Sequence, residues 1–407
     1  MSIATGTTCE PWKQVSETHR SIPELDYPII VHSHLGWDLV WQRPQQFLSR
    51  LSLRHRVLFI EGPVPVPELR SSRVTLREVG DFPNIVVLQT HLPQKRWHDG
   101  QWVDQERRRL VKSALAGPLG AQFERPVQWF YDPMAVTSFA GHMDERAIVF
   151  DCMDELTKFR YAQPELVRRE RELLAVADVV FAGGPKIGDA KRAFNPNCYC
   201  YGCGVDVDHF GRAADPETVV PSEVARLSKP VLGFFGVVDE RMDYELVSAL
   251  AEAHPEWNLV LIGPHAKVDP ASFPRRENIH FLGGRDYGLL PSYVKKFDVC
   301  LMPFAINEAT AYINPTKALE YMAAGRPIVS TAIEDVVAQF SKVVKIARSH
   351  EEFITLCEQA VSQPDQAAIR RGLALARRNS WESIVRKLEG HIAEVLEAKK
   401  GLATTAA

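Results

Sequence analysis

Short apolar runs alternate with helical patterns along most of the chain, and this alternation constrains the fold more than any other feature. In the first half, the apolar runs end in or near Gly, Pro or Asp, and segments such as Gln105–Ala116 and Pro164–Ala177 between them show helical spacing. The strand candidates are Pro28–His34, Arg56–Pro63, Asn84–Leu88, Val127–Asp132, Ala147–Asp154 and Val179–Gly184. Strands that are apolar on both faces and alternate with helices predict a parallel sheet covered on both sides.

The alternation is interrupted once, at Gly211–Lys229, which is polar, contains Pro and has little periodicity. Such a segment is typical of a linker. After it the alternation resumes, with strand candidates Val231–Val238, Asn258–Gly263, Asn278–Leu282, Val299–Phe304, Pro327–Ser330 and Val343–Ala347. We therefore predict an α/β protein of two Rossmann-like, doubly wound domains, 26–210 and 230–380, joined by the linker 211–229. Ligands of such sheets bind at the carboxyl ends of the strands, and two such edges are expected to face one central cleft.

The two ends of the chain are expected to lie outside these domains. Residues 381–400 read as a final helix, with Ser380 as its N-cap and Glu382 in its first turn. Residues 1–25 and 401–407 are expected to be disordered.

Charge and cysteine content narrow the class of protein. The 407 residues include 48 basic and 51 acidic side chains, a net charge of −3, which argues against a nucleic-acid binder. Neither a signal peptide nor an apolar run long enough to span a bilayer is apparent, so we expect a cytoplasmic protein with reduced thiols. Cys198, Cys200 and Cys203 are interleaved with tyrosines and read as a strand rather than a zinc site.

The most informative segment is Asn307–Ser330 (NEATAYINPTKALEYMAAGRPIVS). Asn314 suits a helix N-cap and Pro315 the first helical position. A helix start that follows a strand presents free N–H groups and a positive dipole end, which favours an anion. Lys317 in the first turn would be disfavoured by that dipole unless a phosphate lies beside it. Glu320 follows one turn later, so a capped surface helix with an i, i+3 ion pair is the alternative interpretation.

This segment resembles the nucleotide-sugar site of GT-B fold glycosyltransferases, in the branch written NE…INPTKxLEYMAAGxPxVST. Other stretches resemble the same branch in chain order: His32–Gln45, Phe150–Phe159, Gly183–Pro185, Gly204–Phe210, Gly233–Arg241 and Asn278–Phe304. The resemblance implies transfer of a sugar from a nucleoside diphosphate sugar to a glycan or lipid-linked acceptor. It implies no metal and no cofactor beyond the donor itself, and a role in cell-surface or exopolysaccharide synthesis.

The resemblance also implies a donor site in the second domain. Lys317 and the N–H groups of Thr316 and Lys317 would hold the pyrophosphate, and Arg241 would assist them. Glu320 would bind the ribose. The other implied donor residues are Gly236 in the opening turn, Arg285 in the loop beside the base, Asn307 and Glu308 by the sugar, and Asn314 at the helix start.

One departure leaves the stereochemistry open. Many retaining members carry two glutamates seven residues apart, and Tyr312 stands where the first would fall. Either Glu308 takes over its role or the enzyme is inverting. The same departure keeps a non-catalytic glycan-binding or assembly protein as an alternative. A dinucleotide-dependent oxidoreductase is a weaker alternative, because no G-x-G-x-x-G turn follows a first strand.

An inverting transfer needs a general base, and two candidates follow strands of the first domain. Asp154 follows the apolar run Ala147–Asp151, between other carboxylates that favour a raised pKa, and His34 is its rival. Trp37 and Arg43 are candidates for contacts with the acceptor, and the alternative interpretations are core packing for Trp37 and a surface ion pair for Arg43.

A basic run at Arg107–Arg109, with Lys112, is a candidate for peripheral membrane contact at the inner face of the membrane. A solvated helix face is the alternative interpretation. No contact with nucleic acid is expected.

Overall fold

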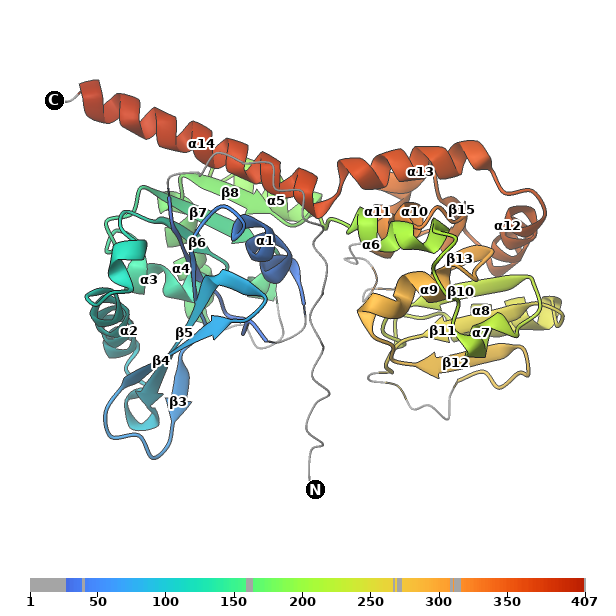
Figure 1. Cartoon of the computed structure of the whole chain (residues 1–407), viewed down its shortest axis with the longest axis horizontal. Helices are drawn as coiled ribbons and strands as arrows, with labels where there is room; N and C mark the ends of the chain where they lie inside the picture. The colour runs from blue at the N-terminus through green and yellow to red at the C-terminus, as the bar shows by residue number, and fades with distance from the viewer. Residues whose placement is uncertain are drawn as a thin grey trace. The chain divides into compact units, whose positions relative to one another are not determined.

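The computed structural model describes residues 27–38, 41–158, 164–265, 268, 273–307, 310 and 316–405. Within them the chain forms two compact units, which are described separately (Figure 1). The N-terminal unit comprises residues up to Gly202 and those from Ile384 onward, and the C-terminal unit comprises Cys203–Ser383. Residues 1–25, for which disorder was expected, lie outside the described residues.

The N-terminal unit is built on a mainly parallel sheet with the strand order β3-β5-β2-β1-β6-β7-β8-β9 and with β4 paired to β5. Its strands are β1(Ile29–His32), β2(Val57–Ile60), β3(Val64–Val66), β4(Arg73–Val79), β5(Phe82–Pro93), β6(Val127–Phe130), β7(Ala147–Cys152), β8(Val179–Ala182) and β9(Cys198–Cys200). The strands β1, β2, β6, β7 and β8 are buried along their whole length, as expected of a sheet covered on both faces.

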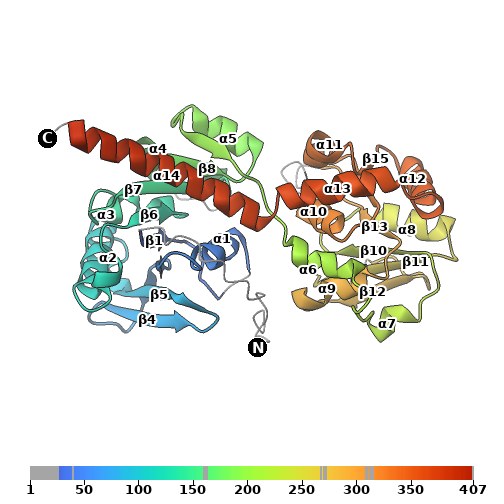
Figure 2. The same ribbon diagram turned by 45° about the horizontal axis from the view of Figure 1, so that its top comes forward.

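Helices cover this sheet, and one of them comes from the end of the chain. They are α1(Arg43–Leu51), α2(Gly100–Leu115), α3(Val136–Phe139), α4(Pro164–Val176), α5(Pro185–Arg192) and α14(Trp381–Thr405), with short 3₁₀ turns η1(Gln94–Arg96), η2(Gly120–Gln122), η3(Pro133–Ala135) and η4(Leu156–Lys158). Figure 2 shows α14 lying along the β7–β8 side of the unit. His391 of α14 stacks on Tyr199, with ring centroids 3.6 Å apart, and its Nε2 lies 2.7 Å from the Tyr201 hydroxyl. These contacts tie the last helix to β9 and the turn after it.

The C-terminal unit has a parallel sheet with the order β12-β11-β10-β13-β14-β15. Its strands are β10(Val231–Phe235), β11(Asn258–Ile262), β12(Ile279–Gly283), β13(Val299–Met302), β14(Ile328–Thr331) and β15(Lys345–Ala347). Its helices are α6(Val207–Gly211), α7(Ser222–Ala225), α8(Tyr244–Ala253), α9(Leu290–Val294), α10(Thr316–Ala323), α11(Glu334–Phe340), α12(His350–Ser362) and α13(Gln366–Arg378), with 3₁₀ turns η5(Arg212–Ala214) and η7(Tyr287–Leu289). Aspartates that follow strands or loops start α6, α8 and α13 by accepting backbone N–H groups.

The segment 211–229, expected as a linker, packs against the C-terminal unit. The Lys295 ammonium donates to the carbonyl oxygens of Asp215, Pro216 and Thr218 at 2.7–2.8 Å, and Val224 of α7 is fully buried. The polar composition of this segment reflects hydrogen bonding to its own domain.

Two expectations about local structure are wrong. The first sheet is not wholly parallel, because β4 forms an antiparallel hairpin with β5, and β5 is longer than the expected Asn84–Leu88. The polar alternation in β4 suits a half-exposed strand, which lacks the apolar run used to find the others. The expected disordered tail is also partly helical, since α14 continues to Thr405 without a proline to stop it.

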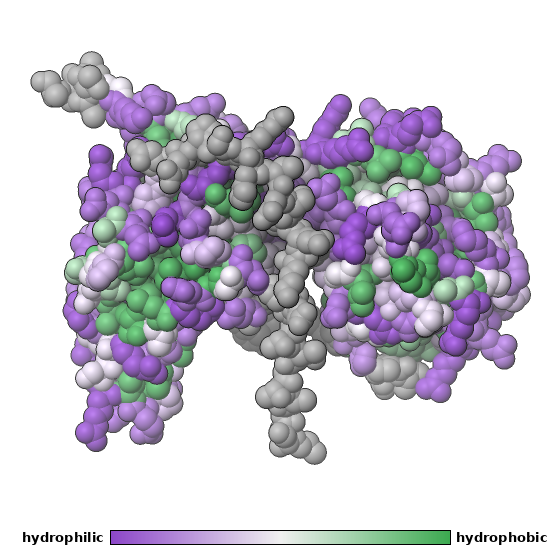
Figure 3. Space-filling model, viewed as in Figure 1, coloured by the Kyte–Doolittle hydropathy of each residue, from purple (hydrophilic) through white to green (hydrophobic). Residues whose placement is uncertain are grey.

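No helix within the described residues is both long and apolar enough to cross a membrane. Figure 3 shows hydrophilic residues over much of the viewed face of each unit, with the largest apolar area on the N-terminal unit.

Candidate functional site at the strand ends

In the C-terminal unit, three glycines form stacked turns at the carboxyl ends of β10, β11 and β12. Gly236, Gly263 and Gly283 have φ angles of +146°, +153° and +71°, which side-chain-bearing residues rarely adopt. The Gly236 N–H donates to the Ile262 carbonyl at 2.8 Å, and a Cβ on Gly263 would lie 1.7 Å from the Gly236 carbonyl oxygen. The glycines therefore allow backbone turns to pack directly on one another at this edge.

Lys317 lies against this edge from the first turn of α10. A Cβ on Gly236 would lie 2.1 Å from Lys317 Cε and 2.8 Å from its Nζ. The ammonium group and the N–H groups of Thr316 and Lys317 at the helix start are thus brought to the end of β10. Both the ammonium group and the helix dipole favour an anion there.

Glu320 is one turn further along α10. Burial raises the pKa of its carboxyl group, and the Lys317 charge acts in the opposite direction. Among the described residues no ion pair joins Lys317 to Glu320, so the interpretation as a surface helix with an i, i+3 ion pair is wrong. The partly buried carboxyl group remains an acceptor without a described protein donor.

Arg241 is held near the same edge by its neighbour Asp239. The guanidinium Nε lies 2.9 Å from Asp239 Oδ1 and its Nη2 lies 2.6 Å from Oδ2, and this carboxylate raises the pKa of Arg241. The Arg241 carbonyl accepts the Ala305 N–H at 2.8 Å, which places it beside the loop that follows β13. About 37% of its side chain stays exposed, so the guanidinium retains a face for a ligand.

Arg285 is placed differently, because its donors are used inside the C-terminal unit. It forms a two-pronged ion pair with Glu223 of α7, with Nη2 2.9 Å from Glu223 Oε2, and its Nε lies 2.9 Å from the Tyr293 hydroxyl. Its Nη1 donates to the carbonyl oxygens of Leu282 and Gly284. Arg285 therefore joins α7 and α9 to the loop after β12.

Of the remaining predicted donor residues, Asn307 is described and lies in the loop after β13. Asn307 is exposed, and its side-chain oxygen accepts the Thr310 N–H at 3.2 Å. Glu308 and Asn314, together with the departure at Tyr312, lie outside the described residues.

In the N-terminal unit, three carboxylates follow one another where β7 ends, and two of them are neutralised. Asp151 is fully buried and paired with Arg43, whose Nε and Nη2 each lie 2.9 Å from Asp151 Oδ1. Glu155 pairs with Lys191 at 2.9 Å. Asp154, between them, has a carboxylate with no hydrogen bond or ion pair to any residue in the described part of the chain, and it is exposed.

The two candidate bases lie close enough to interact. Partial desolvation raises the pKa of Asp154, while the nearby His34 and Arg43 lower it less strongly. The Nδ1 of His34 is buried and has no hydrogen-bond partner among the described residues. The structure thus brings Asp154 and His34, from the ends of β7 and β1, to one edge of the sheet.

The two predicted acceptor contacts are buried. Trp37 is 3% exposed and packs edge-on against Phe59 and Phe82. Arg43 is the first residue of α1, and its Nη1 also donates to the carbonyl oxygens of Tyr201 and Gly202. Trp41, which the sequence analysis did not single out, is 38% exposed and lies edge-on to Trp37. Trp41, and not Trp37, is therefore the tryptophan whose ring is open to a ligand here.

The basic run on α2 is largely used within the unit. Arg107 is buried over the Phe139 ring, Arg108 donates to the carbonyl oxygens of Thr137 and Ser138, and Arg109 forms an ion pair with Glu106. The expected cationic face for a membrane is therefore much weaker than the run of arginines suggests.

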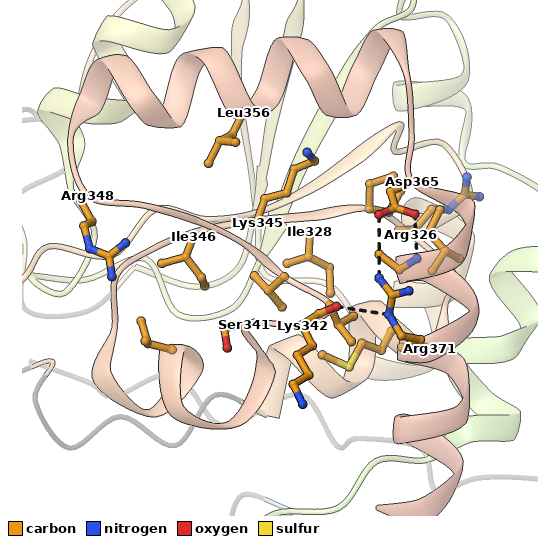
Figure 4. A pocket seen from close by; sticks show the side chains of 18 residues that line it. Arg326, Ile328, Ser341, Lys342, Lys345, Ile346, Arg348, Leu356, Asp365 and Arg371 are labelled. Carbon is orange, nitrogen blue, oxygen red and sulfur yellow. Dashed lines mark hydrogen bonds and ion pairs between the residues drawn. The ribbon is translucent and has the colours of Figure 1, made fainter.

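A separate cavity of about 360 Å³ lies at the amino ends of β14 and β15, away from the carboxyl ends where Lys317 lies. It is lined by the first residues of β14 and β15, Ile328 and Lys345, and by Arg371 of α13 (Figure 4). None of the predicted donor residues lines it, so it is distinct from the Lys317 edge. Among the described residues no group of three or more His, Cys, Asp or Glu side chains is arranged to hold a metal ion.

Comparisons with known proteins agree with this architecture. Residues 229–362 match the family described as glycosyl transferases group 1. The chain is 22% identical over 386 residues to TuaH of Bacillus subtilis (strain 168), named for a proposed role as a teichuronic acid biosynthesis glycosyltransferase, and the match covers 88% of this chain and 95% of that protein.

Solved structures share the fold at low sequence identity. "Trehalose-6-phosphate from E. coli bound with UDP-2-fluoro glucose" matches with a TM-score of 0.62 and 14% identity, over 91% of this chain and 99% of that one. The sucrose-phosphate synthase of Thermosynechococcus elongatus matches with a TM-score of 0.59 and 14% identity, over 91% and 100%. The two Rossmann-like units and these structural matches give the chain the GT-B fold, and the segment that is similar to the group 1 glycosyltransferases, 229–362, lies in the C-terminal unit.

Proposed function

We propose that this chain transfers a sugar from a nucleoside diphosphate sugar to a glycan or lipid-linked acceptor in the synthesis of a cell-surface polysaccharide. The observation that carries the proposal is the Lys317 ammonium lying against Gly236 at the start of α10. The name of TuaH, which refers to teichuronic acid, and the UDP-2-fluoro glucose bound in the E. coli structure support this class of donor and product. A lipid-linked acceptor would bring the enzyme to the inner face of the membrane.

The donor pyrophosphate would bind at the carboxyl edge of the C-terminal sheet. Lys317 and the first N–H groups of α10 would contact it, and the absence of a side chain on Gly236 makes room for the Lys317 side chain at this edge. Arg241, fixed by Asp239, would add a second cation from across the edge. As the sugar leaves, these groups would stabilise the negative charge on the diphosphate without a metal ion.

The other donor contacts are those that the family resemblance implies. Glu320 would accept hydrogen bonds from the ribose hydroxyls, because its carboxyl group has no described protein donor. Asn307, Glu308 and Asn314 would lie by the sugar and the helix start. Arg285 would shape the loop beside the base through its bonds to Glu223 and Tyr293.

For an inverting transfer, Asp154 would act as the general base, with His34 beside it. The carboxylate takes the proton of the acceptor hydroxyl while that oxygen forms the new bond to the anomeric carbon. The bond from the anomeric carbon to the phosphate oxygen breaks, and its electron pair leaves with the nucleoside diphosphate. The raised pKa of Asp154 makes it a stronger base than an ordinary aspartate.

Thermal shift measurements with UDP, GDP, ADP, NAD and the corresponding nucleotide sugars test the donor class. We expect one nucleoside diphosphate and its sugar to raise the Tm, and Lys317→Ala to remove that shift. If NAD raises the Tm and no nucleoside diphosphate does, the proposal is wrong. If a nucleotide sugar binds but is neither transferred nor hydrolysed, the chain is a binding protein rather than an enzyme.

A further inference from the structure

A buried network of charged side chains holds the turn that carries Asp154. Lys191 of α5 is 4% exposed, and its ammonium lies 2.9 Å from Glu155 Oε2 and 2.8 Å from Glu170 Oε2 of α4. The Thr157 hydroxyl donates to Glu155 Oε1 at 2.5 Å. One lysine therefore joins two helices to the residue that follows Asp154.

The same turn is held on its other side by close backbone contacts. The Gly183 N–H donates to the Cys152 carbonyl at 2.9 Å, and a Cβ on Gly183 would lie 2.3 Å from the Met153 carbonyl oxygen. The Cys152 thiol lies 3.5 Å from the Asp154 carbonyl oxygen. With the backbone fixed at 152–154 and the Glu155 side chain fixed by Lys191, the turn has little freedom to rotate.

The network also determines which carboxylate is left for chemistry. Without Lys191, the half-buried Glu155 and the buried Glu170 would be left as two anions without their shared cation, and Glu155 would lose the ion pair that holds its side chain. A displacement of about 1 Å of a catalytic group costs about a hundredfold in rate.

We propose that Lys191 is a positioning residue for Asp154: bound to Glu170, it anchors Glu155 and thereby holds the Asp154 carboxylate at the sheet edge beside His34. This proposal rests on the proposed function, in which Asp154 takes the acceptor proton. It predicts that Lys191 affects the rate through Asp154 and not through donor binding.

The test compares Lys191→Met with Lys191→Met/Glu170→Gln, in which one orphaned charge is removed so that folding is protected. Asp154→Asn and Lys191→Met/Asp154→Asn complete a double-mutant cycle. Lys399→Met is the matched control, because Lys399 makes a surface ion pair with Asp178 just before β8, at the other end of the strands. The assay uses UDP-glucose as the test donor, and the rate of its hydrolysis gives kcat and KM for each variant.

We expect Lys191→Met and Lys191→Met/Glu170→Gln to lower kcat about tenfold to a hundredfold, with KM within about twofold. Adding Lys191→Met to Asp154→Asn should cause no further loss, and Lys399→Met should leave kcat unchanged. If Lys191→Met lowers kcat by the same factor in the parent protein and in Asp154→Asn, the proposal is overturned.

Hydrogen exchange of residues 147–158 provides a second readout that does not depend on turnover of UDP-glucose. It should speed up in both Lys191 variants and stay unchanged in Lys399→Met. Unchanged exchange in the Lys191 variants overturns the proposal even if no activity is found. Full activity of Asp154→Asn instead overturns the base assignment of the proposed function, while the exchange result still reports whether Lys191 holds the turn.

Discussion

The carboxyl edges of the two sheets are built in opposite ways. In the C-terminal unit the edge is formed by backbone, with Gly236 and Gly263 packed on each other and Lys317 lying over them. In the N-terminal unit the edge is formed by charged side chains, with Asp151 paired to Arg43 and Glu155 paired to Lys191. The first construction leaves cations available for an anionic ligand, whereas the second neutralises its charges and leaves one carboxylate, Asp154, without a described partner.

Under the proposed function, the difference separates donor binding in the C-terminal unit from proton transfer in the N-terminal unit. A diphosphate needs donors that approach closely, and glycine turns with a helix start supply them. A general base needs one carboxylate in a defined position, and buried ion pairs can hold a turn more rigidly than exposed ones because breaking them is costly. Four predictions test this comparison.

Replacing Asp154 should have the largest effect. Asp154→Asn removes the general base and should lower the rate of UDP-glucose hydrolysis about 10²-fold to 10⁴-fold, with the Tm shift by UDP unchanged. Asp81→Asn, in the exposed turn between β4 and β5, is the control. A rate within threefold of the parent protein would show that Asp154 is not the base.

Breaking the buried pair at the N-terminal edge should cost much more stability than breaking a partly exposed pair of the other unit. Arg43→Met leaves Asp151 buried and unpaired, and should lower the free energy of unfolding by about 3–5 kcal/mol. The pair of Arg285 and Glu223 is 26% and 34% exposed, so Arg285→Met should cost about 1 kcal/mol or less from the ion pair itself. Urea unfolding measures both, and equal losses would contradict the comparison.

Removing the cation of the C-terminal edge should weaken binding without loss of stability. Lys317→Ala should raise the Kd for the nucleoside diphosphate about tenfold to a hundredfold, since a hydrogen bond to a charged group contributes about 1.5–3 kcal/mol. Calorimetric titration gives the Kd. Lys342→Ala, at the cavity on the opposite edge, should leave it unchanged.

The pH dependence should give the smallest effect. Asp154 must be ionised to accept a proton, and its pKa is raised, so the activity should fall as the pH drops through a value above that of an ordinary aspartate. A rate profile of kcat/KM for UDP-glucose between pH 4 and 8 shows this limb. The limb should be absent from the residual activity of Asp154→Asn, and its persistence there would assign it to another group.

Much of the fold followed from local patterns. The buried strands β1, β2, β6, β7 and β8 are short and mostly apolar runs, and such runs are recognisable without tertiary information. The hairpin of β4 and β5 was not predicted, because β4 alternates polar residues on an exposed edge and its pairing depends on distant contacts.

The candidate site was predicted unevenly for a similar reason. Lys317 and Asp154 stand at helix starts and strand ends, which sequence spacing reveals. Trp37 and Arg43 were expected at the acceptor side, but their burial depends on partners from Phe59 to Asp151 that no local pattern identifies. Lys191 had no distinguishing signal, because a lysine near the end of a short helix is ordinary.

By itself the sequence determined two α/β units, the order of their strands along the chain and the position of the helix start that carries Lys317, because these depend on residue periodicity and on the backbone preferences of Gly and Pro. Only the tertiary structure decided which charges are neutralised. Arg43 and Asp151 are 108 residues apart along the chain, and Lys191 meets Glu155 across 36 residues. Burial and pairing arise from packing between distant segments, so the availability of Asp154 for chemistry could be read only from the folded chain.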